Sequence, residues 1–550
     1  MQTGPAERME GRVELSRWVG RLIGVRQEEV DPGGGGAARV PGAVDAVVVG
    51  GGIAGMSAAV VLAERGVRVT VIESRPTLGG RLAAWPETLA DGTGQPVDHG
   101  FHAFFRQYYN WRSILRRIDP TLGFLRPIPG YPVISAQWPT EEFGRLPPTP
   151  PMNLLALITR SPSLRLRDLR SMDGKAAVPL LAYDPVRTFA ELDDATAEEL
   201  LDSMRLPDRA RAMLFEVFSH SFFNHEREMS AAELVANFHF YLLGNPEGLA
   251  FDAPDQDYET AIWSPLRDYL EARGARVLTG VNAERIQRAA GLGSAAGLGS
   301  AAGLGSAAGG GWRVETTGGE VHTARHLVLA VDPPALTGLL ASSPELAADA
   351  PILAGQAAGF GAGAPYAVAR YWLGGDVAPR RAVFSGVSRQ PTLDSVTVYH
   401  RLERRAREWA ARSGGSVVEL HAYACDPGVS AAELAERMRV ELATLWPEVA
   451  GLPVLDLRAR VEAQAPSFKP GGHRDRPGVV TDADGLFLAG DGIGADFPSA
   501  LMERAAATGI LAANHILRRE GGSAEPLRSI RQRGLLAGRT PATVERHRVS

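Results

Sequence analysis

Two glycine-rich turns, separated by one helix and one strand, dominate residues 47–81 of this 550-residue chain. Valines at 47–49 predict a buried strand, and Gly50, Gly52 and Gly55 follow with GxGxxG spacing. The first glycine permits a tight bend, the second lets a pyrophosphate approach the backbone, and the third lets a helix pack closely on the strand. The N-terminus of that helix favours negative charge because its N–H groups lack partners. The sequence therefore predicts a dinucleotide site.

The second half of this segment indicates which dinucleotide binds. A strand predicted over residues 67–72 ends at Glu73, where a carboxylate accepts hydrogen bonds from the hydroxyls of an unphosphorylated ribose. Ser74 and the run RPTLGGR follow at once. Gly80 allows a second close backbone approach, and Arg81 offers a phosphate a planar fork of donors. This continuation resembles the two-part FAD signature of the amine oxidase and carotenoid desaturase superfamily.

The other end of the chain carries a second candidate flavin motif. The run LFLAGDG contains Gly490 and Asp491, and it resembles the superfamily's late motif, whose aspartate binds ribityl or phosphate oxygens. The alternative is an aspartate that caps a helix or a turn. A helix predicted over residues 498–514 would direct its N-terminus at the flavin. By pattern alone, the resemblance places a backbone contact to the adenine at Val281. The residues that we predict to contact FAD are Gly50, Gly52, Ile53, Ala54, Gly55, Glu73, Ser74, Gly80, Arg81, Val281, Gly490 and Asp491.

The two signatures lie more than 400 residues apart, so one domain must be built from distant segments. The resemblance implies an α/β fold in which a Rossmann-like FAD-binding domain of the glutathione-reductase-2 type is interleaved with a mixed α+β substrate domain. We assign to the FAD-binding domain residues 43–115, 262–335 (with a low-complexity insert at 289–311) and 475–518. We assign to the substrate domain residues 116–261 and 336–474. The flanking parts are an N-terminal extension with a glycine-rich linker, 1–42, and a flexible tail, 519–550.

Composition narrows the functional class. The net charge of −5 gives no electrostatic footprint for nucleic acid. The single cysteine, Cys425, excludes internal disulfides and suits a reducing cytoplasm. We find no signal peptide and no run of 18 apolar residues, so no membrane-spanning segment is predicted. No metal site is predicted either.

Aromatic residues gather directly after the first flavin signature. Six of the eleven residues from 101 to 111 are aromatic, whereas the chain average is 7%. A second group of aromatic residues occupies 215–241. Both groups could be ordinary core, but aromatic faces would also favour a polyene or a cationic intermediate.

A closer resemblance rests on three runs: DHGFHAFFRQYYNWR, EMSAAELVANFHFYLLGNPEGLAFD and FLAGDGIGADFPSALMERAAATG. They are similar to the bacterial β-carotene desaturase/methylase group, the carotenoid φ-ring or isorenieratene synthases. The resemblance implies FAD-dependent aromatisation of the β-ionone rings of a lipophilic carotenoid, with migration of one ring methyl. The N-terminal extension and the AAGLGS insert depart from the group's pattern.

That chemistry needs two two-electron oxidations per ring and a methyl shift, which points to a carbocation. The protein must orient the ring, exclude water and remove protons, while the flavin accepts hydride. We predict His102, Asp496 and His99 as candidate proton acceptors because they follow the two flavin segments. The alternative for each is structural: backbone hydrogen bonds for the histidines and a helix cap for Asp496. No sequence feature identifies the acceptor that reoxidises the flavin.

Two segments are candidates for contact with the inner face of the cell membrane. Leu15, Trp18, Val19, Leu22 and Ile23 recur at helical spacing among arginines, and the run MNLLALI at 152–158 precedes Arg160, Arg165 and Arg167. Either helix could instead pack on its own domain. The sequence thus predicts a cytoplasmic, peripherally associated enzyme. Alternative functions are desaturation or cis–trans isomerisation of acyclic carotenes, amine oxidation, and flavin-free lipid binding.

Overall fold

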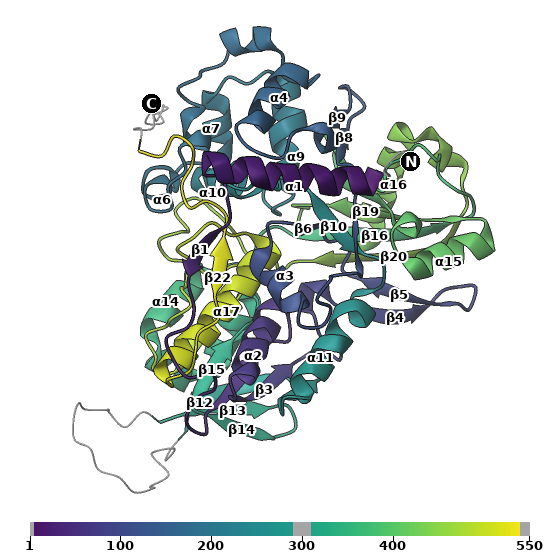
Figure 1. Cartoon of the computed structure of the whole chain (residues 1–550). Helices are drawn as coiled ribbons and strands as arrows, with labels where there is room; N and C mark the ends of the chain where they lie inside the picture. Colours follow the sequence, from purple (N-terminus) through teal and green to yellow (C-terminus); the bar gives the residue numbers. More distant parts are fainter. Residues whose placement is uncertain (1–4, 290–309, 539–550) are drawn as a thin grey trace, which may run out of the picture.

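The computed structural model describes residues 5–289 and 310–538 (Figure 1). Its centre is a sheet of parallel strands in the order β11-β3-β2-β15-β21, as a Rossmann-like fold requires. The strands are β2 Asp45–Val49, β3 Arg68–Glu73, β11 Arg276–Thr279, β15 His326–Leu329 and β21 Leu486–Leu488. The last four residues of β2 and all of β15 and β21 are buried, as parallel strands covered on both faces are. The predicted α/β class is confirmed.

One predicted strand is in fact two. The sequence suggested a single strand over residues 276–287, but Gly280 adopts φ +71° after β11 and turns the chain. The next strand, β12, joins a separate antiparallel sheet with two strands that follow the AAGLGS insert. This sheet consists of β12 Ala283–Arg288, β13 Trp312–Thr316 and β14 Val321–Ala324. The AAGLGS insert lies between β12 and β13, and residues 290–309 are outside the described residues.

Two helices pack tightly beside the central sheet. Helix α2 (Ile53–Glu64) follows the first glycine turn, and α17 (Leu501–Arg519) follows the second flavin motif. A Cβ atom at Gly509 would lie 2.1 Å from the carbonyl oxygen of Ala54, so glycine is required where the two helices touch. Helix α17 begins three residues later than predicted because Ala500, its N-cap, is extended with φ −151°.

A second, larger sheet faces the first. Its order is β20-β16-β19-β18-β17-β8-β9, so strands from both segments of the predicted substrate domain share one sheet. The strands are β8 Pro132–Ile134, β9 Glu141–Glu142, β16 Tyr366–Leu373, β17 Phe384–Val387, β18 Ser395–Val398, β19 Ser416–Ala422 and β20 Val454–Glu462. Helices α15 (Arg404–Ser413) and α16 (Ala431–Leu445) lie beside it (Figure 1).

The remaining helices and short strands belong to both halves of the molecule, because two of the helices, Tyr109–Leu115 and Ser264–Glu271, pack on α2. The helices that follow β9 are α4 Met152–Arg160, α5 Val178–Leu181, α6 Arg187–Leu192, α7 Ala197–Ser203, α8 Asp208–Arg211, α9 Val217–His220, α10 Ala231–Phe238 and α11 Ser264–Glu271. The helix after β6 is α3 Tyr109–Leu115. The short strands are β4 Ala84–Thr88, β5 Gly94–Asp98, β6 Phe104–Phe105, β7 Leu125–Pro127 and β10 Phe251–Pro254.

Residues 333–359 differ from the expected domain assignment. They form α12 (Pro333–Ser342), α13 (Pro344–Asp349) and α14 (Pro351–Gly359). Helices α12 and α13 pack on β12, and α14 packs on both of them. This part of the predicted substrate domain therefore lies with the nucleotide-binding half (Figure 1).

Segments near the two ends of the described chain are joined by strand pairing and hydrogen bonds. Strand β1 (Glu28–Asp31) pairs antiparallel with β22 (Leu527–Ser529), and the Arg518 guanidinium donates to Asp31. The amide of Gly534 also donates to the carbonyl of Tyr183 at 2.8 Å. The expected flexible tail is therefore wrong for this part of the C-terminus, while residues 539–550 are outside the described residues.

The N-terminal helix forms as predicted, but its buried face is different. Helix α1 (Pro5–Ile23) buries Val13, Ser16 and Gly20, and its Leu15 and Trp18 are exposed. Small residues therefore contribute to the buried face, while Leu15 and Trp18 point outward; the side chains of Leu22 and Ile23 are outside the described residues. Across residues 5–289 and 310–538, we find no helix with the length and apolar character needed to cross a bilayer.

Candidate functional site

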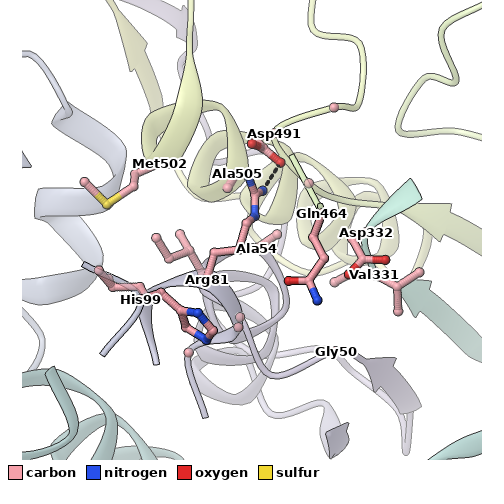
Figure 2. A pocket seen from close by; sticks show the side chains of 18 of the residues that line it. Gly50, Ala54, Arg81, His99, Val331, Asp332, Gln464, Asp491, Met502 and Ala505 are labelled. Atoms are coloured by element: carbon pink, nitrogen blue, oxygen red, sulfur yellow. Dashed lines mark hydrogen bonds and ion pairs between the residues drawn. The ribbon is translucent and has the colours of Figure 1, made fainter. Parts of the chain in front are cut away.

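One large cavity, with a volume of about 720 Å³, lies between the two main sheets. Both predicted flavin segments line it, and so do Phe101, Phe105 and Tyr108 of the first predicted aromatic group. Figure 2 shows Gly50 and Arg81 from the first segment near Asp491 from the second. The fold thus unites segments that are distant in the sequence.

The first glycine turn closes one side of this cavity. Gly50 has φ +109°, and a Cβ atom there would lie 2.2 Å from the carbonyl oxygen of Ala330. Gly52, Ile53 and Ala54 line the cavity. Gly55 does not line it; a Cβ atom at this position would lie 1.9 Å from the Gly50 carbonyl oxygen. The three glycines therefore occupy the positions that their spacing predicts.

Glu73 lies at the end of β3 with its carboxylate fixed by the backbone. Its Oε2 accepts from the amide of Gly51 at 2.7 Å, and its Oε1 accepts from the amide of Arg75 at 2.8 Å. The amide of Val281 donates to the Glu73 carbonyl at 2.9 Å, which brings the β11–β12 turn to the same place. Glu73, Ser74 and Val281 all line the cavity.

The second glycine turn and the late motif meet at an ion pair. Arg81 Nη2 lies 2.5 Å from Asp491 Oδ1 (Figure 2). Burial opposes the charge on the Arg81 guanidinium, but the Asp491 carboxylate outweighs it and raises the pKa of Arg81 above its ordinary value. Gly80 and Gly490 line the cavity beside this pair.

These residues fit FAD. A Cβ atom at Gly52 would have no neighbour closer than 3.8 Å, and one at Gly80 none closer than 3.6 Å, although both positions line the cavity. A side chain at either position would therefore occupy space that a ligand needs. The helix N-terminus and Arg81 are suited to phosphates, and Glu73 is suited to ribose hydroxyls. The pyrophosphate and the ribose of FAD require this donor and acceptor set.

The three predicted proton acceptors have different surroundings. His102 lines the cavity, and its Nδ1 lies 2.8 Å from the Gly100 carbonyl oxygen, which leaves Nε2 as the acceptor. Burial lowers the pKa of His102 to about 4, so its imidazole is neutral. His99 also lines the cavity, but Arg75 donates to its Nε2 at 3.0 Å. Asp496 is exposed and lies outside the cavity lining, and the N-cap of α17 is Ala500 instead.

Aromatic rings form one wall of the cavity. We call Phe101, Tyr131, Phe251 and Phe384 the aromatic compartment; all four line the cavity. The Phe101 and Phe384 rings stack with centroids 4.8 Å apart, and Tyr131 lies 5.3 Å from Phe384. The sequence singled out only Phe101 among them. Most of the second predicted group, including Phe215 and Phe240, is core, although Phe223 reaches the cavity.

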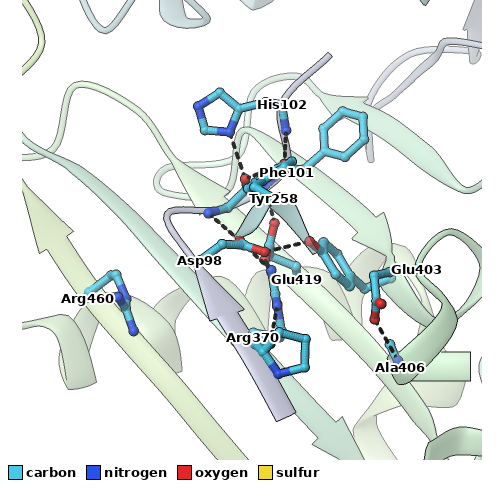
Figure 3. A network of polar contacts seen from close by, with 12 residues as sticks. Asp98, Phe101, His102, Tyr258, Arg370, Glu403, Ala406, Glu419 and Arg460 are labelled. Atoms are coloured by element: carbon cyan, nitrogen blue, oxygen red, sulfur yellow. Dashed lines mark hydrogen bonds and ion pairs between the residues drawn. The ribbon is translucent and has the colours of Figure 1, made fainter. Parts of the chain in front are cut away.

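Sequence reasoning also missed a buried polar network behind this wall. Arg370 on β16 and Glu419 on β19 face each other, and Arg370 Nε donates to Glu419 Oε2 at 2.8 Å (Figure 3). Arg370 also donates to Asp98 at 2.6 Å. Glu419 holds His421, which lines the cavity, as does Tyr423. Opposite charges in two otherwise apolar strands were the signal available in the sequence.

Known proteins resemble this chain in both sequence and fold. The family described as flavin containing amine oxidoreductase matches residues 53–517. A carotenoid phi-ring synthase of Streptomyces griseus is 42% identical, covering 92% of this chain and 95% of the relative. A carotenoid phi-ring synthase of Chlorobaculum tepidum is 30% identical, with coverages of 90% and 91%. The solved structure of cyclohexylamine oxidase from Brevibacterium oxydans has a TM-score of 0.59 at 16% identity, over 87% of this chain and 99% of that chain.

The last likeness concerns the fold alone, whereas the family match and the two relatives extend over most of the sequence. The glycine turns, Glu73, Arg81 and Asp491 line one cavity and offer groups suited to phosphates and ribose hydroxyls. The chain therefore belongs to the flavin-containing amine oxidoreductase family, and its cofactor is FAD.

Proposed function

We propose that this protein is an FAD-dependent carotenoid oxidoreductase that desaturates and aromatises the β-ionone rings of β-carotene. One ring methyl shifts in the reaction, and the products are isorenieratene-type aryl carotenoids. The names of the two relatives, each aligned over about nine-tenths of the chain, support this proposal.

The observation that carries the proposal is the composition of the cavity. It is continuous from the glycine turn at Gly52 to the aromatic compartment. An apolar ring would be favoured there by burial, and a ring cation by the negative faces of the aromatic rings. A protonated amine would also be attracted by aromatic faces, so the names of the two relatives decide between the two substrate classes.

Different residues of the chain bind FAD, orient the substrate ring and accept a proton. Gly52, Gly80 and Arg81 would hold the phosphates of FAD, and Glu73 its ribose. When bound, the flavin supplies the hydride acceptor. The aromatic compartment orients the ring and excludes water. His102 takes up a proton at Nε2, because Nδ1 is committed to the Gly100 carbonyl and the ring is neutral.

His99 and Asp496 are not included as proton acceptors in this proposal. Arg75 can only donate, so the Nε2 lone pair of His99 is already used, and its Nδ1 lies 3.1 Å from the carboxylate of Glu462. His99 therefore positions neighbouring groups. Asp496 is too exposed for a reaction that must exclude water.

We further propose that the protein takes its lipophilic substrate from the inner face of the cell membrane. We define the membrane-docking surface as six exposed apolar residues of α1, α4 and the segment after α4: Leu15, Trp18, Met152, Leu155, Leu166 and Leu169. Thr149, just before α4, donates to the carbonyl of Ser16 in α1 at 3.1 Å, so these elements are neighbours. Arg21, Arg160 and Arg165 are exposed among these residues and suit anionic lipid.

Expression in a bacterium that accumulates β-carotene tests the reaction. Extracted pigments are analysed by liquid chromatography, absorption and mass spectrometry. A product with all its carbons, fewer hydrogens and aryl end groups is the expected result. Unchanged β-carotene in the presence of folded yellow protein would contradict the proposal, and acyclic carotenes would then be tested for desaturation or isomerisation.

A further inference from the structure

We propose that His421 and Tyr423 form a second proton-accepting site in the cavity, which serves a different deprotonation from that of His102. This inference rests on the proposed function. Aromatising one β-ionone ring removes four hydrogens, two as hydride and two as protons. The proposed function assigns one of these protons to His102 and leaves the acceptor of the other unassigned.

The first observation is how His421 is held. Its Nε2 lies 2.8 Å from Oε1 of Glu419, a completely buried carboxylate that also accepts from the amide of Phe101 at 2.6 Å. Arg370 donates twice to the other oxygen, Oε2. Despite the burial, Arg370 and His421 lower the pKa of Glu419 to about 2. The carboxylate is therefore ionised and can only accept from His421.

The orientation of His421 follows from that bond. Since Nε2 must donate to Glu419, Nδ1 carries the lone pair. The Tyr423 hydroxyl lies 3.0 Å from Nδ1, so it donates there. Burial raises the pKa of Tyr423, which keeps the phenol protonated. The hydrogen bonds of this chain of three residues therefore run in one direction: the Tyr423 hydroxyl donates to His421, and His421 donates to Glu419.

The second observation is that this chain opens on the cavity. Tyr423 and His421 both line it. The Tyr423 ring lies 5.4 Å from the ring of Phe223, another lining residue. The Phe101 amide bonds Glu419, which ties the chain to the aromatic compartment. A ring bound in this compartment would therefore lie in the same cavity as Tyr423 and His421.

The backbone at Gly100 leaves room for the His421 ring. Gly100 has φ +103°, and a Cβ atom there would lie 2.8 Å from Cε1 and Nε2 of His421. The carbonyl of the same residue accepts from His102, and its amide donates to Asp98 at 2.8 Å. Asp98 in turn accepts from Arg370 (Figure 3). One network thus fixes both proposed proton acceptors.

The proposed step moves one proton from the ring cation to His421 by way of Tyr423. Once hydride has left the ring, the cation loses a proton from the carbon next to the charge, and the electron pair of that C–H bond becomes the new C=C bond. The proton goes to the Tyr423 oxygen while the Tyr423 proton moves to Nδ1 of His421. The positive charge passes from the ring to the imidazolium, which the Glu419 carboxylate neutralises.

The test uses the full-length FAD-loaded enzyme with β-carotene in detergent. The variants are His421→Asn and Tyr423→Phe, and the matched control is Tyr371→Phe. Tyr371 is a buried tyrosine of the same sheet whose hydroxyl donates to the Ala435 carbonyl and which does not line the cavity. We measure kcat, KM, flavin content and the number of hydrogens lost per product ring.

The expected result is a fall in kcat of about 100-fold for both site variants, with KM and flavin content within about twofold of wild type. Partly oxidised rings that have lost two hydrogens accumulate, and Tyr371→Phe behaves as wild type. Added imidazole restores a His421→Gly variant by about tenfold, which a loss of packing alone would not allow.

Wild-type kcat in folded, FAD-loaded Tyr423→Phe or His421→Asn would overturn the inference while leaving the proposed function intact. If His421→Asn does not fold, Tyr423→Phe alone tests the inference, because this substitution removes only one oxygen atom. A wild-type enzyme that makes no aryl rings would overturn the proposed function itself, and the inference with it.

Discussion

Arg81 and Asp491 are 410 positions apart in the sequence, yet Arg81 Nη2 lies 2.5 Å from Asp491 Oδ1 inside the cavity. The pair joins the turn after β3 to the turn after β21, so each signature depends on the other for its geometry. The guanidinium keeps further N–H donors for a phosphate, and the carboxylate fixes its orientation.

Removing either partner should lower FAD binding. Arg81→Ala removes a phosphate donor from the cavity and leaves the Asp491 carboxylate without its cation. In Asp491→Ala the Arg81 guanidinium loses the carboxylate that fixes its orientation. We expect the affinity of apo-protein for FAD to fall at least tenfold, or about 1.4 kcal/mol, in each variant. Calorimetric titration with FAD and the flavin-to-protein absorbance ratio measure this.

Arg68→Ala is the matched control, because Arg68 pairs with Asp45 at the exposed end of the same sheet. An ion pair between exposed side chains contributes little to the stability of the fold. Because Arg81 and Asp491 touch, the double variant should lose less than the sum of the two single losses. Full FAD content in both single variants would refute our placement of the cofactor.

The nucleotide-binding half could be predicted because its signals are local. The valines of β2, the glycine spacing and Glu73 lie within residues 47–73, and each residue type has one physical task there. The start of α17 was less predictable, because an extended Ala500 rather than a capping side chain defines it.

The substrate half could not be predicted in the same way. Strand β19 is buried along its whole length, so no alternation marks His421 as a cavity residue. Its neighbours Gly100 and Arg370 come from other segments, and only the fold brings them together. The C-terminal tail shows the same limit: its arginine-rich composition gave no sign that β22 pairs with β1.

Alanine should weaken FAD binding at one glycine of the first turn and lower stability at another. Gly52 has φ −83° and ψ −172°, which alanine adopts freely, and its Cβ would enter the cavity. Gly52→Ala should therefore fold normally and bind FAD at least tenfold more weakly. In Gly55→Ala the new Cβ would clash with the Gly50 carbonyl, so stability should fall by roughly 1–3 kcal/mol or more. Urea unfolding and FAD titration separate these effects; equal stability of both variants would contradict the assignment.

The membrane-docking surface predicts a loss of lipid binding without loss of fold. Leu155 and Leu166 are 54% and 62% exposed, so aspartate at either position removes little internal packing. Each substitution should weaken binding to vesicles containing phosphatidylglycerol by roughly tenfold, since a leucine inserted into lipid contributes about 1.5–3 kcal/mol. Co-sedimentation with vesicles measures this. Ile352→Asp, equally exposed but on α14, should bind like wild type; an equal loss in all three variants would argue against a defined surface.

His239 should make the protein less stable as the solution becomes acidic. It is fully buried, its Nε2 lies 2.7 Å from the Arg531 carbonyl oxygen, and its ring stacks on Tyr183 at 4.6 Å. Burial lowers the pKa of His239 to about 4 from its ordinary 6.5. Between these two pH values the unfolded chain binds one more proton than the folded chain at this residue.

The contribution of His239 to the free energy of unfolding is therefore complete above pH 6.5 and is lost as the pH falls towards 4. The total loss is about 3 kcal/mol. In His239→Gln the amide can still donate to the Arg531 carbonyl but does not titrate. Urea unfolding between pH 7.5 and 4.5 should show a shallower decline for this variant than for wild type, by up to one proton. Parallel declines in the two proteins would mean that the pKa of His239 is the same in the folded and the unfolded chain.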